Sequence, residues 1–168
     1  MHKVLSVALA AGVLAASLAR AGTTSTTFTV TATVNATCSA TATALAFPAY
    51  TPGGGAVTGT STISLKCTNG AQPTVALNPG TTTGDAFTQR LMASGTNTLQ
   101  YNLYTTAALA TVWGDGTGTT KTVQVPVAST GLADVLTLTV FGQLPDSATN
   151  KNAVPGSYSD TITATVTY

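Results

Sequence analysis

Apolar and polar residues alternate strictly through residues 26–37, TTFTVTATVNAT. Thr and Val favour pleated structure, and a period of two predicts a strand that buries one face. No turn dipeptide precedes Cys38, so nothing indicates a partner strand nearby in the same chain. A long strand without a partner aggregates unless something receives it, so we expect another copy of the protein to do so. The apolar face consists of Phe28, Val30, Ala32, Val34 and Ala36.

Shorter alternating segments follow along the rest of the chain, separated by turns rich in Gly, Pro and Asn. Pro126 has no backbone N–H to donate to a sheet, so its segment is predicted to be an edge strand or to contain a bulge. Outside the first 18 residues no apolar pattern with a period of 3.6 is sustained, and residues 107–110 can form one helical turn at most. We therefore expect an all-β antiparallel sandwich of seven or eight strands. The predicted strands include residues 45–47, 61–67, 75–77, 90–92, 99–104, 123–127, 136–140 and 158–168.

Residues 1–21 have the pattern of a secretory signal peptide. A short basic head is followed by an apolar run over 4–18 and by the small-x-small motif of residues 19–21. A membrane anchor is the alternative, but a run of about 15 residues is shorter than the roughly 20 that a spanning helix needs. We predict cleavage near Ala21–Gly22, which leaves one domain of ordinary size.

The remaining chain lacks the residues of common catalytic and metal sites. It contains no His and no Glu, so Ser-His-Asp and Cys-His arrangements cannot form. Its five Asp residues mostly sit beside Gly, Ser or Pro, as turn residues do. Four scattered cations cannot build a basic patch, which disfavours nucleic acid as a partner. We predict a protein that is not an enzyme and that binds no cofactor or metal.

Two cysteines, Cys38 and Cys67, follow the predicted signal peptide. An even pair in an exported protein predicts a disulfide, which would close a loop of about 30 residues. The alternative is a pair of free or metal-binding thiols, but two thiols without a His make a poor metal site.

Three local motifs have competing interpretations. Residues 114–118, GDGTG, superficially resemble a phosphate or calcium loop, but they lack its Lys, its helix and its regular carboxylates, so we interpret them as a hairpin turn. The glycosylation sequon at 35–37 is interpreted as chance, because a glycan there would obstruct strand pairing. Trp113 is interpreted as a core residue or a cover over a sheet end, with a surface sugar-stacking ring as the alternative.

Several segments, in a shared order from about residue 26 to the C-terminus, resemble the spore coat protein U domain family. That family includes the major subunits of archaic chaperone–usher pili of Gram-negative bacteria. Pro48 departs from the family, which usually has Gly in a Phe-Gly-x-Tyr pattern. The resembling segments are 47–50 (FPAY), 63–70 (ISLKCTNG), 90–92 (RLM), 99–104 (LQYNLY), 112–118 (VWGDGTG), 138–145 (LTVFGQLP) and 154–168 (VPGSYSDTITATVTY).

The resemblance implies an incomplete immunoglobulin-like antiparallel β-sandwich that lacks its final strand. A periplasmic chaperone lends a strand to the open groove, and the N-terminal extension of another subunit replaces it at an outer-membrane usher. On this chain, residues 22–37 would be that donor extension and residues 38–168 the pilin domain. The side chains that fill the neighbour's groove would be Phe28, Val30, Ala32, Val34 and Ala36.

The expected function is that of a structural pilus subunit, exported through the periplasm to the cell surface, where its fibres support adhesion and biofilm formation. Two alternatives stay open. One is a self-contained secreted β-sandwich, such as a coat or matrix protein. The other is a tip adhesin with a sugar pocket, although a two-domain adhesin would normally need a longer chain.

Overall fold

The computed structural model describes residues 20–168, so most of the predicted signal peptide lies outside the described residues. The chain divides into two units, residues 1–33 and 34–168, which are described separately. In the first unit, the described residues 20–33 form no helix or strand, and all of them are exposed. The second unit holds every strand found in residues 20–168.

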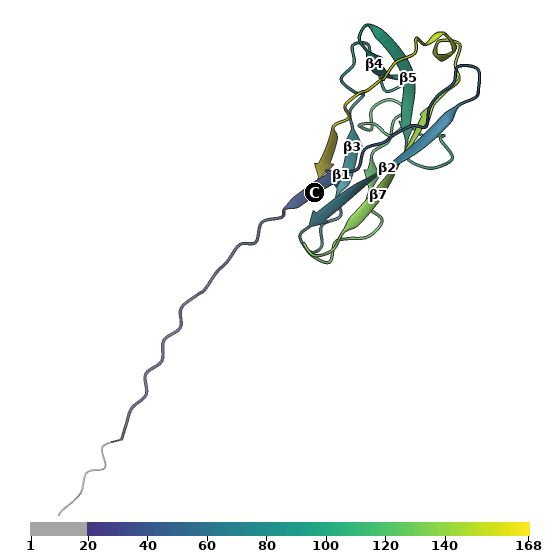
Figure 1. Ribbon diagram of the computed structural model, residues 1–168. Coiled ribbons are helices and arrows are strands. Elements are labelled where there is room, and N and C mark those ends of the chain that lie inside the picture. Colours follow the sequence, from purple (N-terminus) through teal and green to yellow (C-terminus); the bar gives the residue numbers. More distant parts are fainter. Residues whose placement is uncertain (1–19) are drawn as a thin grey trace, which may run out of the picture. The chain divides into compact units, whose positions relative to one another are not determined.

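The second unit is a sandwich of two antiparallel sheets, with strand orders β1-β2-β7-β5-β4 and β6-β3-β8 (Figure 1). This arrangement confirms the predicted all-β architecture and the number of strands. One short 3-10 helix, η1, spans Asn150–Asn152. The strands are β1 (Cys38–Ala42), β2 (Val57–Cys67), β3 (Thr74–Leu77), β4 (Arg90–Ser94), β5 (Asn97–Tyr104), β6 (Val123–Gln124), β7 (Leu136–Leu144) and β8 (Ala164–Thr167).

The core lies between the sheets and follows the alternation of the sequence. Strands β2 and β7 pair so that Ile63 lies opposite Leu138 and Leu65 opposite Leu136, and these four side chains are buried. Trp113 is fully buried and donates its indole N–H to the carbonyl oxygen of Val75 at 2.9 Å. The interpretation of Trp113 as a core residue is therefore confirmed.

Residues 26–37, predicted as a strand, form no strand in the single chain, and the strand predicted at 123–127 is limited to Val123–Gln124. Two further segments also differ from the predicted strands. Residues 45–47 are not in a strand, and the first strand lies earlier, at Cys38–Ala42, where its short side chains show no apolar alternation. The last predicted strand, 158–168, is reduced to Ala164–Thr167. Both differences fall at edges of the sheets, where an element has a partner on one side only.

The predicted disulfide joins Cys38 to Cys67, which face each other across the β1–β2 ladder. The ladder continues one residue toward the N-terminus, because the amide of Thr68 donates to the carbonyl oxygen of Thr37 at 3.0 Å. The segment before Cys38 therefore begins at a covalently fixed pair of strands.

Arg90 is fully buried at the start of β4 and donates to three parts of the fold. Its Nη2 reaches the carbonyl oxygens of Asn78 and Trp113, both at 2.8 Å, and its Nη1 reaches Asn102 Oδ1 at 2.6 Å. The guanidinium also lies 5.6 Å from the centre of the Phe87 ring. Burial lowers the pKa of Arg90, yet its hydrogen bonds keep it in place as a cross-link.

A second polar cluster ties the loop after β1 to the loop after β7. The carboxylate of Asp146 accepts hydrogen bonds from the Tyr50 hydroxyl and from the amides of Gly53 and Gly55. Lys151 lies 3.6 Å from the same carboxylate. These partners, led by the Tyr50 hydroxyl, lower the pKa of Asp146, and desolvation together with Asp146 raises the pKa of Tyr50 to about 12.

The raised pKa of Tyr50 predicts a loss of stability in alkali. The unfolded chain releases the Tyr50 proton near pH 10, whereas the folded protein holds it to about pH 12. Stability from this group is therefore complete below pH 10 and is lost as the pH rises toward 12. We expect Tyr50→Phe to reduce the alkaline loss between pH 10 and 12, as measured by urea unfolding at each pH. An unchanged slope would contradict the assignment, and Tyr168→Phe, at an exposed position, is the matched control.

Candidate strand-acceptor groove

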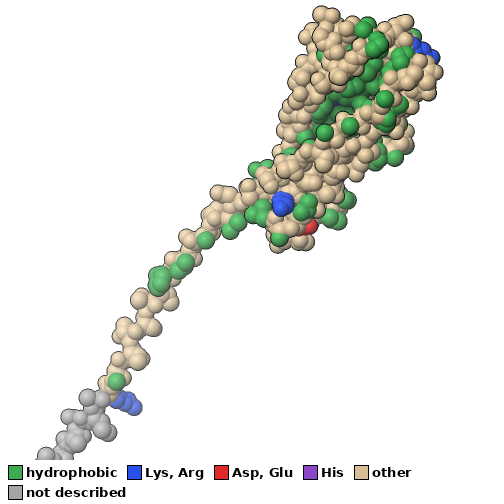
Figure 2. Space-filling model, viewed as in Figure 1, with side chains coloured by type: hydrophobic (Ala, Val, Ile, Leu, Met, Phe, Trp, Pro, Cys, Tyr) green, Lys and Arg blue, Asp and Glu red, His purple; other side chains and the backbone are tan. Residues whose placement is uncertain are grey.

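An apolar groove opens between the two sheets, with a cavity volume of about 400 Å³. Figure 2 shows this face as a hollow in which hydrophobic side chains gather. We call residues 42–47 the first bank and residues 158–166 the second bank. The floor between them is formed by side chains of the core strands, among them Ile63, Leu77, Tyr101, Leu103 and Val140.

The first bank depends on two glycines of the sheet beneath it. Gly59 of β2 and Gly142 of β7 are paired, and the side chains of Leu45 and Phe47 lie against them. A Cβ atom on Gly142 would lie 2.8 Å from Leu45 Cδ1 and 3.0 Å from Phe47 Cζ, which is too close for unchanged packing. The Phe47 ring also packs edge-on against Tyr101, with centroids 6.2 Å apart. The absent side chains thus let this bank lie close to the sheet.

The backbone of the first bank is largely free of partners. Thr43 donates to the carbonyl oxygen of Thr62, but residues 44–50 make no backbone hydrogen bond within the part of the chain that the structure describes. This segment therefore has polar groups available to a further strand.

The second bank alternates in the same way along 158–166. The even positions Tyr158, Ile162, Ala164 and Val166 are half-buried, while the odd positions are exposed. The backbone groups of the odd residues form hydrogen bonds on the side away from the groove. Ser159 exchanges two such bonds with Ala93 of β4, and the Thr163 carbonyl oxygen accepts one from the amide of Asn78. The even residues therefore direct their amides and carbonyls toward the groove.

Ile162 shows the open edge most clearly. Within residues 20–168, neither its N–H nor its C=O has a hydrogen-bond partner. Strand β8, which continues this bank, pairs with β3 and with no other strand of the described chain. An open edge of this kind is a template for one more strand.

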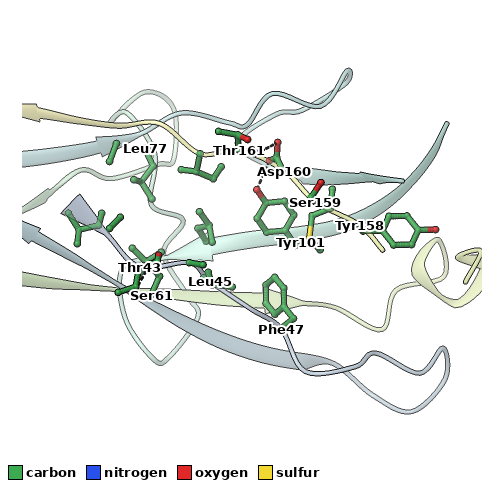
Figure 3. A pocket seen from close by; sticks show the side chains of 18 residues that line it. Thr43, Leu45, Phe47, Ser61, Leu77, Tyr101, Tyr158, Ser159, Asp160 and Thr161 are labelled. Carbon is green, nitrogen blue, oxygen red and sulfur yellow. Dashed lines mark hydrogen bonds between the residues drawn. The ribbon is translucent and has the colours of Figure 1, made fainter. Parts of the chain in front are cut away.

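Asp160 fastens the second bank to the floor of the groove. Its Oδ2 accepts a hydrogen bond from the Tyr101 hydroxyl at 2.5 Å (Figure 3). Its Oδ1 accepts from the amides of Thr81 at 2.9 Å and Thr161 at 2.7 Å. Burial, followed by the bond to Asp160, raises the pKa of the Tyr101 hydroxyl, so this contact stays protonated and intact at neutral pH. The bank is thus held in place without a strand on its groove side.

A second hollow extends the groove toward Pro155. It has a volume of about 610 Å³ and shares Leu45, Phe47, Met92 and Tyr158 with the first hollow. The apolar surface available to a strand is therefore longer than either hollow alone.

The predicted donor residues are exposed in the single chain. Phe28, Val30 and Val34 are 85%, 81% and 89% exposed, and Ala32 and Ala36 are exposed as well. A single chain does not test whether they enter another subunit, so their role stays a prediction. The residues of the two banks were not identified as a site from the sequence, although alternation along 158–166 was a signal for a half-buried strand.

The other candidate chemistry gives no site. Asp115, in the motif at 114–118, accepts hydrogen bonds from the amide and hydroxyl of Thr117, which hold a turn and lower the pKa of the carboxyl. Among the described residues no group of three or more His, Cys, Asp or Glu could hold a metal ion. Within residues 20–168 no helix is long and apolar enough to cross a membrane.

Two antiparallel sheets with one edge position open define an incomplete immunoglobulin-like sandwich. The chain belongs to the Spore Coat Protein U domain family, whose model matches residues 24–165. A similar fold occurs in the crystal structure of the CsuC–CsuE chaperone–tip adhesion subunit pre-assembly complex from archaic chaperone-usher Csu pili of Acinetobacter baumannii. The TM-score is 0.56 at 21% identity, and the match covers 81% of this chain and 41% of that chain. No match was found among curated proteins.

Proposed function

We propose that this protein is a structural pilus subunit that polymerises head-to-tail by strand donation. The observation that carries the proposal is that one chain holds both an open strand position and an exposed alternating segment that suits it. A contact between two different surfaces of the same molecule does not close on itself, so it generates a fibre.

Burial of the extension supplies the driving force. Phe28, Val30 and Val34 would each contribute roughly 1.5–3 kcal/mol, so the gross gain is on the order of 5–10 kcal/mol with the alanines added. Main-chain hydrogen bonds to the open edges add to it, and the ordering of a flexible segment offsets part of it. The balance favours a long-lived contact.

The geometry at Thr37 favours donation to another chain over pairing within the same chain. Thr37 extends the β1–β2 ladder past Cys38, so this residue continues the direction of β1. A return of residues 22–33 to the groove would require a reversal near residues 34–37, VNAT, where Asn35 is the one residue that favours a turn.

The open groove also suggests assembly partners. Exposed edges beside an apolar hollow aggregate unless they are covered, so a periplasmic chaperone would occupy the groove until an outer-membrane usher exchanges it for the extension. Membership of the family and a fold shared with a chaperone–subunit complex support this route. The subunit would pass through the periplasm to the cell surface, where its fibres support adhesion and biofilm formation.

The test compares an inward and an outward substitution in the extension. Val30→Asp would place a charge in the groove, so we expect it to abolish fibres, whereas the matched control Thr29→Asp faces outward and should assemble. Deletion of 22–37 should leave a chaperone-bound subunit that cannot be donated onward. Assembly is measured by electron microscopy and by ladders that resist SDS without heating.

Normal fibres from the deletion variant would reject the proposal. So would a stable monomer, purified without a chaperone, whose unfolding free energy is unchanged by loss of residues 22–37. That second result would favour a self-contained secreted sandwich.

A further inference from the structure

The antiparallel pairing of the strands beside the groove indicates the direction in which a further strand would enter it. Strand β8 is antiparallel to β3, and β3 is antiparallel to β6. Both sheets of an immunoglobulin-like sandwich are antiparallel, so an added strand beside β8 runs antiparallel to it. The Phe28 end of the extension then lies near Val166, and the Ala36 end lies near Tyr158.

Residues of the extension and of the bank can face each other only if both have inward side chains, and in both segments these are the even-numbered residues. The even residues of the second bank have inward side chains and direct their backbone groups toward the groove. Directly opposite residues in an antiparallel pair share one face of the sheet. The inward residues of the extension are also even-numbered, so even positions pair with even positions.

The sizes of the side chains then select one register, because opposite residues must share the space above one floor. We propose that Ala32 of one subunit lies opposite Ile162 of the next, an inference that rests on the proposed strand donation. In this register Ala32 and Ala36 face large residues of the bank, and Val30 faces the small Ala164. Phe28 and Val166, at the end of the strand, are the one pair of two large apolar side chains. The full set of opposite pairs is Phe28 with Val166, Val30 with Ala164, Ala32 with Ile162, Val34 with Asp160, and Ala36 with Tyr158.

Shifts by two residues fit less well. One shift places Val30 against Ile162 and Val34 against Tyr158, which sets large side chains against each other. The opposite shift places Ala32 against Ala164, which leaves space unfilled, and sets Val34 against Ile162. Overpacking and cavities both destabilise a core, so both shifts are disfavoured.

The one charged residue among the even positions of the bank, Asp160, is compatible with an apolar neighbour. The Asp160 carboxylate already accepts hydrogen bonds from Tyr101, Thr81 and Thr161, so Val34 beside it would leave no polar group without a partner. The extension also offers five inward positions to the five even positions from Tyr158 to Val166.

Paired cysteines test the register in assembled fibres. Ile162→Cys is kept constant and is combined with Ala32→Cys, Val30→Cys or Val34→Cys. Directly opposite Cβ atoms lie about 4.5–5.5 Å apart and diagonal neighbours up to about 7–8 Å apart, so the opposite pair comes closest to the Cβ separation of about 3.5–4.5 Å that a disulfide needs and should cross-link most readily. We expect covalent ladders that survive boiling without reductant to be strongest with Ala32→Cys and much weaker with the other two.

A size exchange gives an independent readout. Ala32→Leu should prevent assembly, because Leu would collide with Ile162. Adding Ile162→Ala to Ala32→Leu should restore assembly, whereas adding Ala164→Gly to Ala32→Leu should not. Cross-links through position 30 or 34 instead of 32, or none in fibres that assemble normally, would overturn the register while leaving strand donation intact. Failure of the unsubstituted protein to form ladders would instead reject the proposed function.

Discussion

Arg90→Met is expected to lower the free energy of unfolding by about 2–5 kcal/mol. The substitution retains an unbranched hydrocarbon chain but removes the guanidinium and its hydrogen bonds to the carbonyl oxygens of Asn78 and Trp113. Each buried acceptor left without a partner costs about 1–3 kcal/mol. Asn102 Oδ1 keeps the amide of Leu103 as a donor, so its loss is smaller. Urea unfolding followed by Trp113 fluorescence measures the change.

Two further variants separate the role of Arg90 from a general effect of lost charge. Arg90→Lys retains a cation with fewer and differently placed donors, so we expect an intermediate loss. Lys121→Met removes a charge from an exposed side chain and should stay within about 0.5 kcal/mol of the unsubstituted protein. An Arg90→Met variant as stable as the parent would show that relief from burying the charge balances the lost hydrogen bonds.

Removal of the Cys38–Cys67 disulfide should cost a similar amount, roughly 3–4 kcal/mol in the chain-entropy model. The two cysteines are 29 residues apart in sequence, so the bond excludes many open conformations of the unfolded chain. The double variant Cys38→Ser with Cys67→Ser should unfold at a lower urea concentration. Because Cys67 is fully buried, the serine hydroxyl adds a burial cost of its own.

Reductant provides the control for this prediction. Dithiothreitol should destabilise the parent protein and leave the double variant unchanged, since that variant has no disulfide to reduce. Equal unfolding curves for the oxidised and reduced parent would contradict the expected contribution.

Much of the fold could be predicted because its central strands bury one face. Alternation in β2 and β7 identifies the buried positions, and Ile63, Leu65, Leu136 and Leu138 are all in the core. Strand β1 was not predicted because its sequence, CSATA, contains no large apolar residue. As an edge strand it has one partner strand, so it needs no buried face on both sides. The last strand was predicted too long because 158–163 has the pattern of a paired strand although one of its edges is open.

The site could be predicted in part. Alternation identified Phe28, Val30 and Val34 as an apolar face without a partner, and the structure has them exposed. The groove could not be located from the sequence, because its two banks come from segments more than 100 residues apart. Nor could Arg90 be recognised as buried, because two of its partners are backbone carbonyl oxygens, which every residue carries and which no residue type identifies.

The position of the disulfide has a mechanical consequence for a fibre built in this way. Only Thr37 separates Cys38 from Ala36, the last residue of the donated segment. Tension along the fibre would pass from that segment into the first residues of β1, where the bond to Cys67 transfers the load covalently to β2. Pulling would therefore not peel β1 from its sheet at this point, and reduced fibres should rupture or lengthen at lower force than oxidised ones.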